Sequence, residues 1–157
     1  KMGSETKLEE INLSEIVEKV VSYLDRRLPS MGKTVELTNE VDSEININAN
    51  GVLISWAIEN VIKNGIDAVD NNGKICVKMR KNLKNVVIQI VDSGKGISRK
   101  DWRNIFRPGF SSKAQGWGLG LSLTSRIIKE IHGGTIRVAK SNIGNGTTIE
   151  ITLPQPN

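Results

Sequence analysis

The sequence has few of the residues that stabilise secreted or membrane-spanning chains. Cys76 is the only cysteine among 157 residues, so an intramolecular disulfide is excluded and a reducing compartment such as the cytoplasm is expected. No apolar run approaches the roughly 20 residues of a membrane span, and no secretory signal is visible. If the chain is the cytoplasmic part of a membrane-anchored sensor, its anchor lies outside this sequence.

Signals of metal and nucleic-acid binding are also scarce. His132 is the only histidine, and no Cys and His spacing typical of zinc sites occurs. The 22 basic residues exceed the 17 acidic ones by five, but they form no dense basic block interleaved with aromatics. The excess suits general solubility or a phosphate-bearing ligand, and nucleic-acid binding is the weakest alternative.

The length and the patterning predict one domain with its own core. Residues 1–4, "KMGS", are typical of a cloning remnant, and residues 5–157 form the expected domain. Apolar residues at helical spacing predict helices over 13–28, 52–69 and 121–134, with Asn12 and Glu15 as a capping box for the first and Pro29 as its end. In the third helix the inward residues are expected to be Leu123, Ile127, Ile128 and Ile131.

Alternation of apolar and polar residues predicts the strands. They are expected at 33–41, 44–49, 73–80, 85–92, 135–140 and 147–154, and the third and fourth and the last two are expected to form antiparallel pairs. The fold class is therefore α+β: a mixed, mostly antiparallel sheet of about five strands with about three helices on one face.

The second helix contains "WAIENVIKNGIDAVD", residues 56–70, whose polar residues fall on one side. At about 100° per residue, one narrow stripe holds Asn60, Lys63, Asn64 and Asp67. A solvated stripe is the simplest interpretation. Asparagine is a poor helix former, however, and two amide oxygens on one face can hold a magnesium ion that keeps most of its waters.

Two glycine-rich segments follow. In "VDSGKGI" Asp92 ends a strand and precedes Gly94 and Gly96, so its carboxylate could accept a hydrogen bond from an exocyclic amine such as that of adenine, although a plain turn is the alternative. In "GWGLGLSL" we expect Gly116, Gly118 and Gly120 to precede a helix, whose free N–H groups favour an anion. Lys113, in the segment between them, could reach a terminal phosphate as a mobile lid closes.

In this order the four segments resemble the catalytic domain of histidine kinases, within the superfamily that also contains DNA gyrase, the ninety-kilodalton heat-shock protein and the mismatch-repair ATPases. The resemblance covers residues 10–153 and implies the two-layer Bergerat fold. "NVIKNGIDAV" is similar to the asparagine box, "DSGKG" to the first glycine box, "IFRPGFSSK" to the phenylalanine box and "GWGLGLSL" to the second glycine box.

The resemblance implies roles for individual residues. Asn64 would coordinate Mg²⁺, with Asn60 supporting it, and Asp92 would read adenine. Phe106 would anchor a lid over the ATP site, and catalysis is assigned to Asn60, Asn64 and Lys113. The resemblance further implies that the site is lined by Lys63, Asp67, Gly94, Gly96, Ile97, Phe106, Lys113, Gly116, Gly118, Leu119 and Gly120. Gly65 departs from the pattern, since alanine is commoner there.

The resemblance also implies partners. Family members phosphorylate a histidine on a separate dimerisation domain, which then passes the phosphoryl group to a response regulator, and nothing in this chain resembles that domain. The isolated chain is expected to be monomeric and its parent a homodimer. Because the superfamily's hydrolases carry a glutamate where this chain has Asn60, phosphoryl transfer is preferred. An ATP hydrolase, an anti-sigma-factor-type serine kinase and a non-catalytic nucleotide-binding module stay open as alternatives.

Overall fold

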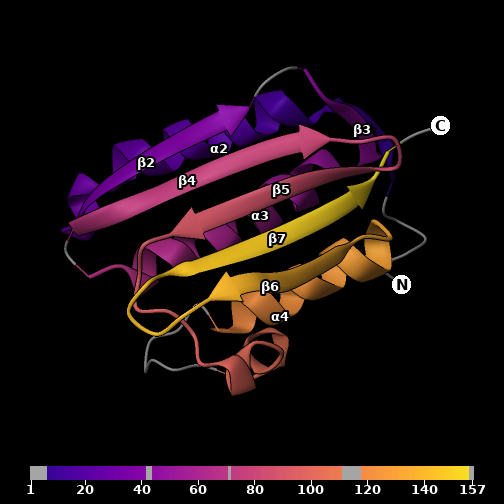
Figure 1. Cartoon of the computed structure of the whole chain (residues 1–157). Helices are drawn as coiled ribbons and strands as arrows, with labels where there is room; N and C mark the ends of the chain where they lie inside the picture. The colour runs from indigo at the N-terminus through magenta and orange to yellow at the C-terminus, as the bar shows by residue number, and fades with distance from the viewer. Residues whose placement is uncertain (1–6, 42–43, 71, 111–117, 156–157) are drawn as a thin grey trace.

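A computed structural model shows the arrangement of the chain and describes residues 7–41, 44–70, 72–110 and 118–155, with only the backbone described at 118–120. One layer is a five-stranded sheet in the order β2-β4-β5-β7-β6, and the helices cover one face of it (Figure 1). The main strands are β2 (Thr34–Val41), β4 (Asn72–Lys81), β5 (Asn85–Asp92), β6 (Thr135–Ser141) and β7 (Thr147–Pro154). Among the described strands of this sheet, only the β2–β4 pair is parallel, which confirms the predicted mixed sheet and its two hairpins.

Among the described residues, three α-helices form the second layer. They are α2 (Leu13–Arg27), α3 (Gly51–Ala68) and α4 (Gly118–Arg126), and α4 continues into a π-helical segment, η4 (Ile127–Ile131). Single 3₁₀ turns lie at η1 (Pro29–Met31), η2 (Arg99–Asp101) and η3 (Asn104–Phe106). As predicted, the Asn12 side chain caps α2, accepting a hydrogen bond of 3.1 Å from the Glu15 N–H.

Isoleucine and leucine side chains fill the space between the two layers. Burying each contributes about 1.5–3 kcal/mol, so this interface dominates the stability of the fold. The largest side chains with less than 2% exposure are Leu13, Leu24, Ile45, Ile47, Ile54, Ile58, Ile62, Ile75, Ile88, Ile90, Ile128 and Ile151. Within the described ranges, no helix combines the length and apolar character needed to cross a membrane.

The structure departs from the sequence-based expectations in three places. Residues Glu9–Asn12 form an unpredicted strand, β1, which pairs with β3 (Asn46–Ala49) in a separate two-stranded sheet. Helix α4 begins at Gly118, so Gly118 and Gly120 lie inside its first turn rather than before it. Leu123 is 38% exposed, because the buried face follows ordinary α-helical spacing through Leu121, Thr124, Ser125 and Ile128, and Leu123 lies off that face.

His132 joins the end of η4 to the start of α3. The ring is buried; its Nδ1 lies 2.9 Å from the Ile127 carbonyl oxygen, and its Nε2 accepts a 3.0 Å hydrogen bond from the Asn50 N–H. Asn50 in turn caps α3 through its side chain. This arrangement needs a neutral ring with its proton on Nδ1, and burial lowers the pKa of His132 below 6.5. His132 therefore fixes the start of the helix that carries the asparagine stripe, the polar side formed by Asn60, Lys63, Asn64 and Asp67.

Replacing His132 should cost stability in a pH-dependent way. We expect His132→Phe to lower the free energy of unfolding by about 2 kcal/mol at pH 7.5, since two buried backbone groups lose their partner. The folded state disfavours the protonated ring, so the wild type's advantage is complete above pH 6.5 and shrinks as the pH falls below it. Urea unfolding of both proteins from pH 7.5 to 5 measures this difference, and a difference that does not vary with pH would contradict the neutral-ring assignment.

Candidate functional site

Asp92 is a buried carboxylate at the end of β5. It is 7% exposed and accepts a 2.8 Å hydrogen bond from the Gly94 N–H and another from the backbone of Thr147. Burial nevertheless outweighs these bonds and raises the pKa of Asp92 from 3.8 to about 6. A carboxylate held in this way is desolvated and poised to accept a hydrogen bond from a ligand.

The glycines around Asp92 allow backbone to approach it closely. A Cβ on Gly94 would lie 2.6 Å from the Ala68 carbonyl oxygen, and one on Gly96, whose φ is +82°, would lie 2.1 Å from the Asn142 carbonyl oxygen. The first glycine box thus fits tightly between the end of α3 and the turn between β6 and β7. The Lys95 N–H also donates to the Ala68 carbonyl oxygen at 3.1 Å, which fixes this loop to α3.

Gly65 lies where helix α3 packs against Asp92. A Cβ at this position would lie 3.4 Å from the Asp92 Cβ and 3.5 Å from its Oδ2, so this face of α3 packs directly against the carboxylate. These are ordinary van der Waals separations, so alanine would also fit, and glycine leaves a small space where helix α3 meets the end of β5.

The residues of the asparagine stripe are less exposed to solvent than the polar side of a plain amphipathic helix would be. Asn60 is 8% exposed, and its Nδ2 donates to the Trp56 carbonyl oxygen at 2.9 Å. Asn64 is half-buried, and within the described part of the chain its side-chain amide has no hydrogen-bond partner. Lys63 forms a 2.8 Å ion pair with Glu59, and the nearby Asp67 is half-buried and has partners of its own.

The remaining predicted residues are only partly covered by the structure. Ile97 and Phe106 are half-buried and pack against the core. Gly118, Leu119 and Gly120 form the first turn of α4. Lys113 and Gly116 lie outside the described residues.

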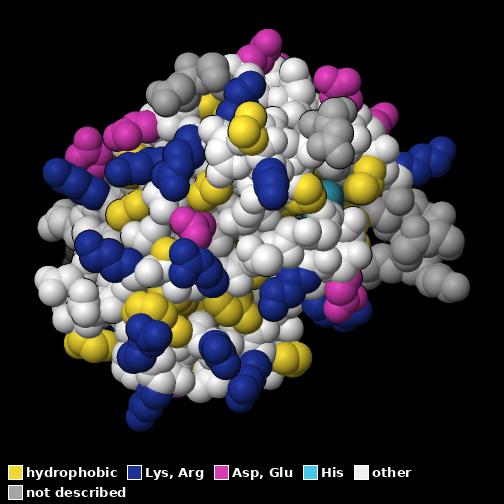
Figure 2. All heavy atoms as spheres, turned by 45° about the vertical axis from the view of Figure 1, so that its right-hand side comes forward, with side chains coloured by type: hydrophobic (Ala, Val, Ile, Leu, Met, Phe, Trp, Pro, Cys, Tyr) yellow, Lys and Arg dark blue, Asp and Glu magenta, His cyan; other side chains and the backbone are white. Residues whose placement is uncertain are grey.

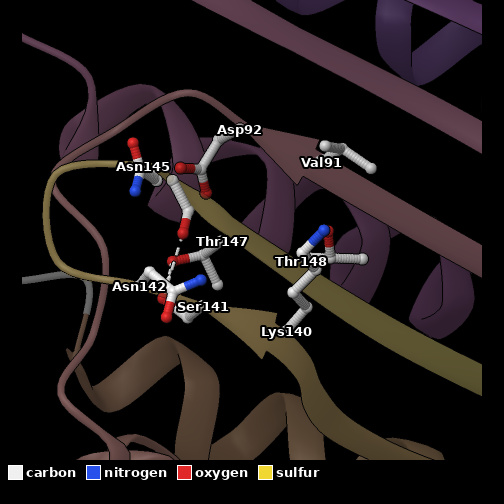
Figure 3. A pocket seen from close by; sticks show the side chains of 9 residues that line it. Val91, Asp92, Lys140, Ser141, Asn142, Asn145, Thr147 and Thr148 are labelled. Atoms are coloured by element: carbon white, nitrogen blue, oxygen red, sulfur yellow. Dashed lines mark hydrogen bonds between the residues drawn. The ribbon is translucent and has the colours of Figure 1, made fainter.

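A hollow of about 350 Å³ lies at the ends of β5, β6 and β7 (Figure 3). Asp92 contributes to it, but Asn60 and Asn64 do not. The other lining residues are Val91, Lys140, Ser141, Asn142, Asn145, Gly146, Thr147 and Thr148. The hollow therefore marks the turn between β6 and β7 rather than the whole of the predicted nucleotide site.

Sequence reasoning missed two residues near the carboxyl end of β5. Thr147 pairs in register with Asp92, and the Ser141 hydroxyl lies 2.7 Å from the Thr147 hydroxyl, as the dashed line in Figure 3 shows. Both side chains are buried. Only the threonine had a signal in the sequence, because it follows Gly146 in the closing "GNGTTIEITLP" motif.

Charge is mixed rather than concentrated on the face that Figure 2 draws. Figure 2 shows Lys and Arg side chains scattered over one face among acidic and apolar ones. In the described portion of the chain, no group of three or more His, Cys, Asp or Glu residues could hold a metal ion.

Comparison with known proteins identifies the family. Residues 49–157 match the family described as histidine kinase-, DNA gyrase B- and HSP90-like ATPase. Sporulation kinase C of Bacillus subtilis (strain 168) is 30% identical over 142 residues, covering 90% of this chain and 33% of that protein. Sensor histidine kinase ZraS of Escherichia coli (strain K12) is 38% identical over 113 residues, covering 72% of this chain and 24% of that protein. The chain thus spans a third or less of the length of these relatives.

A solved structure agrees along almost the whole chain. The catalytic domain of histidine kinase ThkA superimposes with a TM-score of 0.84 at 30% identity, covering 95% of this chain and 96% of that one. This match confirms the predicted Bergerat fold, and the family match confirms the resemblance read from the four boxes. The chain belongs to the histidine kinase-, DNA gyrase B- and HSP90-like ATPase family and is an ATP-binding catalytic domain of the histidine kinase type.

Proposed function

We propose that this chain binds Mg²⁺-ATP and transfers its γ-phosphoryl group to a histidine on a separate dimerisation domain of the same parent protein. The observation that carries the proposal is the desolvated carboxylate of Asp92, enclosed by the first glycine box and by Gly65 of α3. Its ionised form would accept a hydrogen bond from the exocyclic amine of adenine, with Ile97 beside the base. Such a charge-assisted bond contributes about 1.5–3 kcal/mol.

The asparagine stripe suits a magnesium ion. Asn64 offers an amide oxygen that is not used elsewhere in the described residues, and Asn60 is fixed by its bond to the Trp56 carbonyl oxygen. Mg²⁺ is commonly held by one or two protein oxygens together with phosphates and water, so this sparse donor set fits it. Bound there, the ion would neutralise phosphate charge.

The phosphates would lie near the start of α4. Gly118, Leu119 and Gly120 form its first turn, where backbone N–H groups have no partner within the helix and the helix dipole favours an anion. We assign Gly116 and Lys113 to the same task, together with Lys63 and Asp67 of α3. Phe106 would anchor the base of the lid, since it packs against the core.

Transfer to a docked acceptor is preferred over hydrolysis of ATP. An amide cannot take a proton from water, and Asn60 occupies the position of the hydrolytic glutamate. The neighbouring Glu59 is engaged with Lys63 at 2.8 Å. Phosphoryl transfer depends mainly on positioning and charge neutralisation, which this set of residues would supply. Hydrolysis, and transfer to a serine in a partner protein, are the alternatives.

The partners follow from this assignment. We propose that residues 5–157 form one catalytic domain, monomeric in isolation and cytoplasmic, within a homodimeric parent whose dimerisation domain passes the phosphoryl group to a response regulator. A solved structure of histidine kinase ThkA, 27% identical to this chain, contains that kinase in complex with response regulator protein TrrA. That complex supports an analogous partner for this chain's parent.

Labelled ATP tests the reaction. We expect phosphate transfer to a histidine-bearing helical hairpin from a sensor kinase, giving an acid-labile product, and little transfer to water or to a serine-containing anti-sigma-type substrate. Acid treatment before electrophoresis separates the products, because phosphohistidine is lost and phosphoserine is kept. Predominant release of free phosphate, or an acid-stable product, would favour the corresponding alternative.

Asp92→Asn should separate binding from stability. Raising the pKa from 3.8 to about 6 costs the folded state about 3 kcal/mol at pH 7, so removal of the charge should leave the protein at least as stable. ATP binding measured by calorimetry should nevertheless fall at least about 100-fold, because the amide presents donors where an acceptor is needed. The exposed Asp25→Asn is the matched control, and normal ATP binding by Asp92→Asn would refute the adenine assignment.

The same assignment predicts how binding depends on pH. Only the ionised Asp92 is a pure acceptor, so affinity should weaken as the pH falls through about 6. Adenosine is the better probe, because its sugar and base do not titrate in this range whereas the phosphates of ATP do. Its dissociation constant, measured by NMR titration from pH 7.5 to 5, should rise, and a flat profile would contradict the prediction.

Asn64→Ala tests the magnesium assignment. We expect the variant to lose at least about tenfold in ATP affinity with Mg²⁺ present, and little when the ion is chelated. The exposed Asn48 on β3 provides a control substitution of the same kind. Equal losses with and without Mg²⁺ would show that Asn64 contacts the nucleotide or the fold instead of the ion.

A further inference from the structure

Ser141, the last residue of β6, joins three segments at the end of the sheet. Its side chain is 8% exposed, and its Oγ accepts a 2.7 Å hydrogen bond from the Ile97 N–H. The same oxygen lies 3.1 Å from the Gly146 carbonyl oxygen and 2.7 Å from Thr147 Oγ1. One buried hydroxyl therefore contacts both the segment after the first glycine box and the start of β7.

The proton count gives each of these bonds a direction. A serine hydroxyl has one proton and two acceptor lone pairs. The Gly146 carbonyl can only accept, so Ser141 donates to it, and the lone pairs receive the Ile97 N–H and the Thr147 hydroxyl proton. The hydroxyl is then fully satisfied, and no other orientation satisfies all three neighbours.

Both ends of this network reach residues of the proposed nucleotide site. On one side, the Ile97 carbonyl oxygen accepts a 3.1 Å hydrogen bond from the indole N–H of Trp102, which lies in the segment before the predicted lid. On the other side, the backbone of Thr147 bonds the Asp92 carboxylate. A Cβ on Gly146 would lie 2.1 Å from the Asp92 carbonyl oxygen, so the turn and the end of β5 are in direct contact.

We propose that Ser141 is a positioning residue for nucleotide binding, which holds Ile97 and Thr147 at a fixed separation and so sets the adenine-binding side chains against each other. This inference rests on the proposed function. Without the hydroxyl, the Ile97 N–H, the Gly146 carbonyl and the Thr147 hydroxyl lose a buried partner together. The loop would have to move to find new ones, and binding sites tolerate displacements of only about 0.5 Å.

Ser14 provides a matched control elsewhere in the fold. It is also buried, at 7% exposure, and its hydroxyl likewise accepts a 3.0 Å hydrogen bond from a backbone N–H, that of Ile45. It lies at the start of α2, next to the small β1–β3 sheet. Ser14→Ala therefore removes a similar bond without touching the proposed site.

The test compares ATP affinity with stability in the variants Ser141→Ala, Ser141→Thr and Ser14→Ala. Urea unfolding should show a loss of stability for both alanine variants, and the larger loss for Ser141→Ala, whose hydroxyl has three buried partners. Calorimetry should show ATP binding about tenfold weaker in Ser141→Ala, close to wild type in Ser141→Thr, which keeps the hydroxyl, and unchanged in Ser14→Ala. Thr147→Val removes the other hydroxyl of the pair and should weaken binding in the same direction; it carries the test if Ser141→Ala does not fold.

The outcomes separate this inference from the proposed function. Wild-type protein that fails to bind ATP would overturn both. If the wild type binds ATP and the affinities of Ser141→Ala and Thr147→Val stay within about twofold of it, the positioning role alone is overturned. An equal loss of ATP affinity in Ser14→Ala would also overturn that role. Selective loss in Ser141→Ala with rescue by threonine would establish it.

Discussion

The proposed chemistry of this domain depends on the desolvation of one carboxylate. Asp92 accepts two backbone hydrogen bonds, yet burial dominates and raises its pKa to about 6. In the free protein the charge is therefore held at a cost, and a ligand that donates a hydrogen bond recovers part of it. The sheet and the helices supply enough apolar burial to tolerate this cost, and the local backbone determines where the acid points.

That local backbone is assembled from segments distant in the sequence. Gly65 of α3 leaves room beside the carboxylate, Gly94 and Gly96 let the following loop pass against α3 and the β6–β7 turn, and Gly146 lets that turn touch the end of β5. His132 holds the start of α3, which is the end of the helix away from Asp92. A Cβ on Gly94, Gly96 or Gly146 would clash with a backbone oxygen, which explains why the site is rich in glycine although it lies on a regular sheet.

Much of this could be predicted from sequence because the signals are local. Alternation gave the β4–β5 hairpin and placed Asp92 at a strand end, and the spacing of Asn60 and Asn64 placed both amides on one face of α3.

The elements and residues that sequence reasoning missed depend on longer-range or weaker signals. Strand β1 has four residues and no alternation, and its pairing with β3 is set in three dimensions. Ser141 has no motif of its own, since its role comes from the register of β6 against β7 and from the loop that packs over both. Helix α4 starts among glycines, which local propensity disfavours.

The most direct test of the central claim compares ATP with inosine triphosphate by calorimetry at pH 7.5 with Mg²⁺. The two nucleotides share their ribose and phosphates, but inosine carries a carbonyl oxygen in place of the exocyclic amine of adenine. A buried Asp92 carboxylate facing that oxygen would be left without a donor, so the account predicts binding at least about 100-fold weaker for inosine triphosphate. Equal affinity for the two nucleotides would contradict the claim that this buried acid recognises the base.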